Sequence, residues 1–375
     1  MLIRDNLHKL HLQISTPALL IDEQQMLENL SDMQLAADKN AVALRPHCKT
    51  HKSPQLAKIQ LERGATGITV AKPSEAELML RHGIDDIFIA NQVSHPIKIK
   101  QLEQLHNKAR LICGIDHPAQ IEILKKGFEN YSKALNVRIE IDCGFGRCGL
   151  KADDSLLVTL AKKIKQKRWL HLEGLFTHAG QAYSAQTLQQ IKEIAKTEAV
   201  QILKARDILE ESGIKLASIS VGSTPTAKEV IKINGITEVR PGNYIFYDGI
   251  QKALHVASSD QCSLFVLATV ISQPARDRIV CDAGSKALNL DKGAHSTGII
   301  DHFGEILNIA GKIERVSEEH GIICLEKEQQ IEIGSAVLII PNHACTVANL
   351  YKNYHLVKKD LSVQVMPILA RGMSQ

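Results

Sequence analysis

The chain has 375 residues, of which 44% are hydrophobic, and its formal net charge at pH 7 is only +4. This length and composition suit a globular protein with two domains, or one large domain with an appendage. The small net charge and the lack of a basic stripe interleaved with aromatic side chains argue against nucleic-acid binding. No stretch is long and apolar enough to span a bilayer, so we expect no membrane partner.

The cysteines and the N-terminal residues indicate the cellular compartment in which the protein is expected. Eight cysteines are scattered along the chain without the spacing of a disulfide scaffold, which indicates reduced thiols and a cytoplasmic protein. Asp5, His8 and Lys9 stand near the N-terminus, where a signal peptide would have an apolar core.

Short apolar runs alternate with amphipathic stretches from about residue 40 to residue 250. Eight runs are predicted as strands: Val42–Leu44, Gly67–Ala71, Asp86–Ala90, Arg110–Cys113, Val137–Ile141, Leu170–Phe176, Leu216–Val221 and Ile236–Arg240. Amphipathic segments such as Pro54–Arg63, Ser74–His82 and Ser184–Ser212 are predicted as helices between them. Eight consecutive β-α units favour an α/β fold with a (β/α)8 TIM-like barrel over an open doubly wound sheet.

The segment 144–149, Gly-Phe-Gly-Arg-Cys-Gly, matches the glycine spacing of a dinucleotide-binding turn. A dinucleotide fold would place an acidic residue at the end of the next strand, whereas Glu173 lies in the middle of it. The match also falls in the fifth unit of the series. We therefore interpret the segment as a glycine-rich turn that presents Arg147.

After about residue 255 the helical periodicity largely disappears, which predicts an antiparallel β domain. Its expected strands, separated by Gly, Pro and Asp turns, are Leu264–Ser272, Asp277–Asp282, Ile306–Val316, His320–Leu325 and Ala336–Ile340. We accordingly divide the chain into a barrel, residues 15–252, and a β domain, residues 253–375.

Ligands of such barrels bind at the carboxyl ends of the strands, and a lysine stands at the first of these ends. The first strand leads into Arg-Pro-His-Cys-Lys-Thr-His-Lys, residues 45–52, with Lys49 among other cationic groups. Neighbouring cations can lower the pKa of a lysine, and a neutral amine forms a Schiff base with an aldehyde cofactor. The ordinary alternative for this segment is a solvated basic loop.

A turn after the seventh strand suits a phosphate. Gly222, Ser223 and Thr224 offer backbone N–H groups, hydroxyls and a helix N-terminus, and phosphate sites after strands seven and eight are typical of this barrel. A phosphate turn and a Schiff-base lysine together indicate pyridoxal phosphate. The turn alone could equally be a helix cap. Other residues at this end could be surface or packing residues: Arg147, His178, Tyr183 and Tyr244.

His343 and Cys345 lie two residues apart after the apolar run Val337–Ile340, so both side chains can face one side of an extended segment. Imidazole and thiolate are good zinc ligands, and two protein ligands would leave coordination positions for water and substrate, as a catalytic metal requires. A short His-x-Cys pair alone is weak support for a metal.

Together these motifs resemble the fold-type III pyridoxal phosphate enzymes, and within them the D-serine dehydratase/D-threonine aldolase family. The resemblance runs from Thr16–Asp22 to His343–Cys345 and rests on the motifs RPHCKTHK, GRCG, GSTPT, RPGNYIFYD, DAGSK, SEEHG and PNHAC. It implies a barrel of the alanine racemase type followed by a C-terminal β domain, to which residues 1–14 add a strand. It also implies a homodimer with active sites near the interface.

The resemblance implies a role for each matching residue. Lys49 is similar to the Schiff-base lysine, Arg147 to the arginine facing the phenolic oxygen of the cofactor, and His178 to the histidine stacked on its ring. The remaining cofactor contacts would be Tyr183, the phosphate clamp of Gly222, Ser223, Thr224 and Tyr244, and Arg240, which stands where alanine racemases place an arginine against the pyridine nitrogen.

His343 and Cys345 resemble the metal pair of the family, with zinc as the expected ion and manganese as the alternative. In the best-known aldolases the second ligand is aspartate and in the dehydratases it is cysteine, so Cys345 favours the dehydratases.

The function implied is that of a pyridoxal phosphate-dependent, divalent-metal-assisted lyase acting on a β-hydroxy D-amino acid, in the first place D-serine, with pyruvate and ammonia as products. Three alternatives stay open. The chain could be a D-threonine aldolase that forms glycine and an aldehyde, or, as Arg240 suggests, a metal-independent amino-acid racemase. It could also be a pyridoxal phosphate-binding homeostasis protein without catalysis, although such a binder would have no use for a metal pair.

Overall fold

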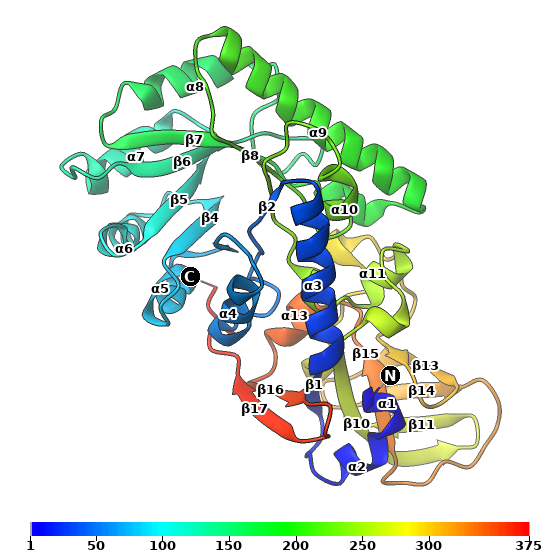
Figure 1. Cartoon of the computed structure of the whole chain (residues 1–375). Coiled ribbons are helices and arrows are strands. Elements are labelled where there is room, and N and C mark those ends of the chain that lie inside the picture. The colour runs from blue at the N-terminus through cyan, green and yellow to red at the C-terminus, as the bar shows by residue number, and fades with distance from the viewer. Residues whose placement is uncertain (1, 375) are drawn as a thin grey trace.

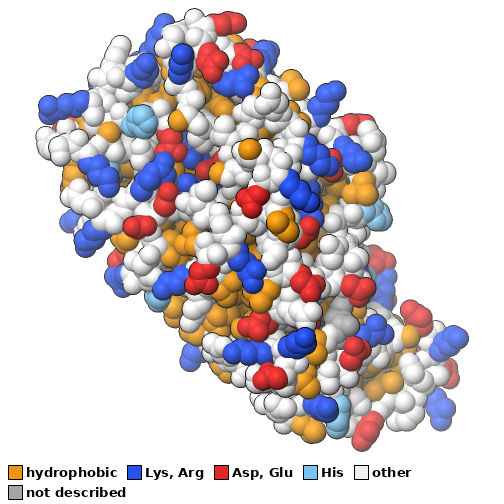
Figure 2. All heavy atoms as spheres, in the orientation of Figure 1, with side chains coloured by type: hydrophobic (Ala, Val, Ile, Leu, Met, Phe, Trp, Pro, Cys, Tyr) orange, Lys and Arg blue, Asp and Glu red, His pale blue; other side chains and the backbone are white. Residues whose placement is uncertain are grey.

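Two sheets organise the chain in the computed structural model, which describes residues 2–374 (Figure 1). A parallel sheet with its helices lies in the upper part of the view, and a largely antiparallel sheet lies in the lower part. Among the described residues, no helix has both the length and the apolar character needed to cross a bilayer. Figure 2 shows basic and acidic side chains interspersed over the visible face, in keeping with the small net charge.

The eight parallel strands follow the spatial order β2-β9-β8-β7-β6-β5-β4-β3. A parallel bridge between His47 and Thr69 joins the two ends of this sheet, and the Cys48 N–H donates to the Thr69 carbonyl at 2.8 Å. The eight predicted strands and the barrel class are confirmed. Their bounds are β2 (Ala43–Leu44), β3 (Ile68–Val70), β4 (Asp86–Gln92), β5 (Arg110–Ile115), β6 (Leu135–Glu140), β7 (Leu170–Phe176), β8 (Ser218–Val221) and β9 (Glu238–Val239).

Helices connect these strands, and their starts follow from local sequence. In α4 the hydroxyl of Ser53 accepts from the Leu56 N–H and Pro54 occupies the first turn, where its missing N–H costs nothing. The barrel helices are α3 (Glu23–Lys39), α4 (Pro54–Glu62), α5 (Pro73–Arg81), α6 (Pro96–His106), α7 (Ala119–Phe128), α8 (Ser155–Lys165), α9 (Leu188–Glu211), α10 (Ala227–Val230) and α11 (Gly249–Ala253).

The second sheet has the order β11-β14-β13-β12-β15-β10-β1-β16-β17. All its neighbours are antiparallel except β1 and β16. Its strands are β1 (Ala18–Asp22), β10 (Leu264–Ala275), β11 (Arg278–Cys281), β12 (Glu305–Ile306), β13 (Gly311–Val316), β14 (Gly321–Leu325), β15 (Ala336–Ile340), β16 (Asn353–Val357) and β17 (Val363–Pro367). Two short helices, α12 (Ser285–Leu288) and α13 (Ala344–Ala348), interrupt the series.

The predicted strand Ile306–Val316 is two strands, β12 and β13. The side chain of Asn308 explains the break, because it donates to the Ala336 carbonyl and accepts from the Leu338 N–H. An asparagine that takes over backbone hydrogen bonds in this way favours a turn over a continuous strand.

The expected strand in residues 1–14 is wrong in the described part of that segment, residues 2–14. This segment forms two short helices, α1 (Leu2–Asp5) and α2 (Leu7–His11). Ile3, Leu7 and Leu10 are buried, and their spacing of four and three residues places them on one side of a helical path. The N-terminal strand of the β sheet is β1, which pairs with β10 and β16 before the chain enters the barrel.

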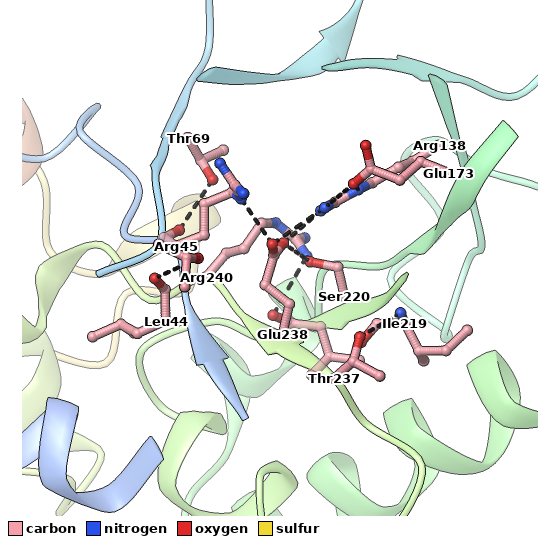
Figure 3. Close-up of polar contacts among 12 residues, drawn as sticks. Leu44, Arg45, Thr69, Arg138, Glu173, Ile219, Ser220, Thr237, Glu238 and Arg240 are labelled. Atoms are coloured by element: carbon pink, nitrogen blue, oxygen red, sulfur yellow. Dashed lines mark hydrogen bonds and ion pairs between the residues drawn. The ribbon is translucent and has the colours of Figure 1, made fainter. Parts of the chain in front are cut away.

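A buried ionic network lies inside the barrel (Figure 3). Arg138 contacts Glu173 at 2.6 Å and Glu238 at 2.5 Å, and Arg45 contacts Glu238 at 2.7 Å. Burial alone would raise the pKa of Glu238, but Arg138 and Arg45 outweigh it and hold that pKa well below its usual range. Each charge has partners that offset its desolvation.

Removing one arginine from this network should destabilise the fold strongly. Arg138→Met leaves two buried carboxylates short of a partner, so the free energy of unfolding from urea titration should fall by about 3–5 kcal/mol. The control is Lys204→Met, because Lys204 pairs with Asp153 on the surface and exposed pairs contribute at most about 1 kcal/mol. Equal effects of the two substitutions would mean that the internal network does not stabilise the barrel.

Candidate functional site

A cavity opens at the carboxyl ends of the barrel strands, and both domains contribute to its wall. Lys49 enters it from the turn after β2, and Cys345 enters it from the β domain. Nine of the predicted site residues line the cavity: Lys49, Arg147, His178, Tyr183, Gly222, Ser223, Thr224, Arg240 and Cys345.

Lys49 is the free amine of the cavity. No hydrogen bond or ion pair engages its Nζ among the residues whose side chains are described, whereas the nearby Lys52 is paired with Glu75 at 2.7 Å. Burial lowers the pKa of Lys49, and the neighbouring Arg147 adds to the decrease although Cys345 opposes it. The resulting amine loses its proton more readily than a free lysine, as a Schiff-base nucleophile must.

The turn after β8 presents hydroxyls to the cavity. The Thr224 Oγ1 accepts from the backbone N–H groups of Gly242, at 3.2 Å, and Asn243, at 2.9 Å, so its own proton is left to donate. Ser223 contributes a second hydroxyl. Gly222 lines the cavity at φ +107°, but its N–H donates to Glu198 Oε1 at 2.8 Å. The N–H of Gly222 is therefore turned away from the position expected for a phosphate donor.

Tyr244 lies outside the cavity, contrary to its expected place in the phosphate clamp. Its side chain is buried, and its hydroxyl accepts a hydrogen bond from Gln60 Nε2 at 3.1 Å. The preceding residues Gly242 and Asn243 line the cavity in its place. The RPGNYIFYD motif therefore indicated the right segment, because Gly242 and Asn243 line the cavity, but the wrong side chain, because Tyr244 does not.

Glu198 is a functional candidate that the sequence reasoning missed. It lies on α9 beneath the turn after β8, fully buried, and accepts from the Gly222 N–H and from the Thr226 hydroxyl at 3.1 Å. Burial raises its pKa to about 7. The available signal was an acidic residue within the buried stripe of a helix, beside Ala195 and Ala199.

The raised pKa of Glu198 should make stability depend on pH. The folded chain binds this proton more tightly than the unfolded chain, so stability falls as pH rises from about 4.5 to about 7. Glu198→Gln mimics the protonated acid and should be more stable than the wild type above pH 7, by about 3 kcal/mol, with the advantage gone below pH 4.5. Urea unfolding of both proteins across this range tests the difference, and an advantage that does not vary with pH would contradict it.

Arg240 is held by the network inside the barrel. Its guanidinium donates to Ser220 Oγ and to the Thr177 carbonyl, both at 2.5 Å, and Ser220 in turn donates to Glu238 (Figure 3). Burial lowers the pKa of Arg240 to about 10, although Glu238 opposes the decrease. A fixed cation therefore faces the cavity.

Arg147 and His178 supply different kinds of polar group. Arg147 comes from the glycine-rich turn after β6, is about half exposed, and has Glu140 as its nearest acid at 3.7 Å. Burial, together with the charges of Lys49 and Arg147, holds the pKa of His178 well below its usual value. His178 is therefore a neutral imidazole at neutral pH.

Four rings lie close together beside the cavity wall, which His178 and Tyr183 line, and one of the four comes from the β domain. The ring centroid of His295 lies 4.9 Å from that of Phe145, 5.3 Å from Tyr183 and 6.5 Å from His178. His295 could not be predicted as a site residue, because nothing in its segment shows that it reaches the barrel.

His343 and Cys345 are not on an extended segment, as the spacing argument assumed. His343 is the residue before α13, with φ −134°, and Cys345 lies in the first turn of that helix. The Cys345 sulfur lies 3.2 Å from Thr50 Oγ1, and the Nδ1 of His343 lies 2.8 Å from Asp291 Oδ2. The turn from β15 into α13, and not strand alternation, brings the two side chains together.

The two side chains form a charged pair. Burial alone would lower the pKa of His343, but Cys345 and Asp291 raise it to about 10. Burial alone would raise the pKa of Cys345, but His343 lowers it below the usual thiol value. A thiolate is the form of cysteine that binds metals, and a divalent ion would replace the extra proton of His343, so the pair fits a divalent ion.

A second group of potential ligands lies near Arg147. Ligand atoms of Asp116, Glu140 and Cys148 lie within 4.8 Å of one another. Both oxygens of Asp116 already accept hydrogen bonds, from the Gly149 N–H and from Gln120, and Glu140 accepts from Gln92. We assign no metal to this group, because its carboxylates are already engaged.

Two family models match the chain. The alanine racemase N-terminal domain matches residues 21–249, and a putative serine dehydratase domain matches residues 263–357. Among curated proteins, a D-threonine aldolase from Arthrobacter sp is 32% identical over 97% of this chain and 94% of its own length. A D-serine dehydratase from Dictyostelium discoideum is 31% identical over 92% of this chain and 94% of its own length.

A third relative has solved structures. The D-threo-3-hydroxyaspartate dehydratase from Delftia sp. (strain HT23) is 32% identical over 94% of this chain and 97% of its own length. Its structure superposes with a TM-score of 0.89, covering 95% of this chain and 98% of that one. Structures also exist of a histidine-to-alanine variant and of a cysteine-to-alanine variant two positions further on, the latter in a metal-free form.

Proposed function

Because the chain belongs to the family of the alanine racemase N-terminal domain, with a serine dehydratase domain following it, we propose that it is a pyridoxal phosphate-dependent, metal-assisted lyase. Its proposed substrate is a β-hydroxy D-amino acid, in the first place D-serine. The observation that carries the proposal is a single cavity containing the free amine of Lys49, a hydroxyl-rich turn and the thiol of Cys345.

The donor set fits pyridoxal phosphate. The hydroxyls of Ser223 and Thr224 suit its phosphate, and the amine of Lys49 suits its aldehyde. When bound, the cofactor supplies a ring that withdraws electrons from the α-carbon of an amino acid. The Nζ of Lys49 would then be the base placed to take the α-proton. His178, being neutral, can pack against the ring without adding charge.

The donor set of the β domain fits a divalent ion, and zinc suits an imidazole with a thiolate better than manganese does. His343 and Cys345 would hold it, and it would supply Lewis acidity for a hydroxyl leaving group. The Delftia relative supports this pair, because its histidine and cysteine variants have the same two-residue spacing and one is metal-free.

Dehydration of D-serine and cleavage of D-threonine-like substrates both use this arrangement. Cys345 supports dehydration, because the thiolate is the ligand that we associate with the dehydratases of the family. The similarity to the Arthrobacter D-threonine aldolase over nearly the whole chain keeps aldol cleavage as the second candidate. Pyruvate and ammonia mark the first reaction, and glycine with an aldehyde marks the second.

We propose a cytoplasmic homodimer as the working form.

Lys49 should be the residue that carries the cofactor. The purified protein should be yellow, and borohydride should fix pyridoxal phosphate covalently on Lys49, because its amine is free and its pKa is lowered. Peptide mass mapping locates the adduct. Lys52 is the internal control because its amine is paired with Glu75, and an adduct there would overturn the assignment.

Loss of Cys345 should separate cofactor chemistry from metal chemistry. Cys345→Ala should keep the yellow colour and the exchange of the substrate α-proton with solvent deuterium, because Lys49 is unchanged. Zinc content should fall, and release of pyruvate from D-serine should drop at least about 100-fold if the metal contributes several kcal/mol to the barrier.

The matched control for that experiment is Cys324→Ala, which removes a cysteine of β14 that does not line the cavity. It should keep both zinc and turnover. Unchanged elimination and zinc content in Cys345→Ala would show that Cys345 is an ordinary thiol and that the metal-assisted mechanism is wrong.

A further inference from the structure

The carboxylate of Asp291 contacts the Nδ1 side of the His343 imidazole. Its Oδ2 is 2.8 Å from His343 Nδ1, and the same oxygen is 2.9 Å from the Thr346 hydroxyl. Thr346 is three residues beyond His343, one turn along α13. The carboxylate therefore contacts both the imidazole and the helix that follows it.

The main chain of Asp291 is fixed as well. The buried amide of Asn342 donates through Nδ2 to the Asp291 carbonyl at 3.0 Å and to the His302 carbonyl at 2.6 Å. Asn342 directly precedes His343 in the chain. The segment that carries Asp291 is thus tied to the segment that carries His343 through both a side chain and a backbone contact.

This geometry determines which nitrogen of His343 can bind a metal. An imidazole whose Nδ1–H donates to a carboxylate keeps its Nε2 lone pair for coordination, and the carboxylate also makes that lone pair more basic. Because Nδ1 is engaged by Asp291, Nε2 is the nitrogen left to share an ion with the Cys345 sulfur.

We propose that Asp291 is a positioning residue of the metal centre, which holds His343 in the tautomer and orientation that bind the ion. The proposal rests on the proposed function, because it assumes that His343 and Cys345 are the metal ligands. Thr346 and Asn342 hold Asp291 in place for this role.

The test is zinc binding to the cofactor-loaded protein, measured by competition with a chromogenic chelator. Asp291→Ala should weaken zinc binding about 10–100-fold, the range that such outer partners contribute. Asp291→Asn should weaken it less, because an amide oxygen still accepts from Nδ1–H. The control Asp301→Asn should bind zinc like the wild type, because that carboxylate lies on the same segment and pairs with Lys312 at the surface.

Two further measurements distinguish positioning from a loss of structure. In the presence of chelator, Asp291→Asn should still unfold in one cooperative transition, at a temperature lowered only by the loss of the Asp291–His343 ion pair. The rise in melting temperature on adding zinc should be smaller than in the wild type. The visible absorption of the cofactor should be unchanged, because Lys49 and the turn after β8 are untouched.

His343→Ala distinguishes a failure of the Asp291 proposal from a failure of the proposed function. If it loses zinc while Asp291→Ala and Asp291→Asn bind zinc like the wild type, Asp291 has no positioning role and this proposal is overturned. If His343→Ala itself keeps wild-type zinc affinity, the metal pair is wrong, and the proposed function fails together with this inference.

Discussion

The buried carboxylate of Asp248 connects the two halves of the site. Its Oδ2 accepts from the Ala344 N–H of α13, at 2.8 Å, and from the Asn243 amide after β9, at 2.5 Å. Its Oδ1 accepts from the Gln251 N–H and so caps α11. One fully buried side chain thereby fixes the helix that carries Cys345 against a wall of the barrel cavity. This contact, together with the 3.2 Å contact between Cys345 Sγ and Thr50 Oγ1, sets the separation between the lysine of one domain and the thiol of the other.

A surplus of cationic groups gives the cavity its chemical character. Lys49, Arg147 and Arg240 line it, and Arg240 is fixed from below through Ser220 by the network that holds the barrel together. Burial and these charges hold the pKa values of His47 and His178 well below the usual range, so the histidines stay neutral. Such a cavity favours anionic ligands, as a phosphate and an amino-acid carboxylate are.

The barrel could be predicted from sequence because its strands are buried on both faces and read as continuous apolar runs. The β domain was harder to predict. β16 and β17 form a hairpin at one edge of the sheet, where residues such as Val365 are exposed and polar residues interrupt the pattern. The strand expected in residues 1–14 came from the family resemblance, and Ile3, Leu7 and Leu10 are too few to establish a helical period that would have opposed it.

The site residues also differ in whether they could be predicted from sequence. Residues in the turns that follow a strand, such as Lys49 and Thr224, could be placed from sequence because strand ends share one edge of the barrel. Glu198, His295 and Asp291 could not be placed, because each acts through a contact between segments far apart in the chain. A motif can also indicate a segment without indicating which of its side chains reaches the site. Asn243 lines the cavity, whereas the next residue, Tyr244, is hydrogen-bonded to Gln60.

The barrel lysine and the His–Cys pair of the β domain are expected to form one active site. Anomalous X-ray diffraction at the zinc edge, from crystals of the cofactor-loaded protein, locates the metal relative to both. We expect one zinc peak about 2.0–2.3 Å from His343 Nε2 and Cys345 Sγ, beside cofactor density that is continuous with Lys49. A zinc peak at Asp116, Glu140 and Cys148 in an active protein, with none at His343, would contradict it.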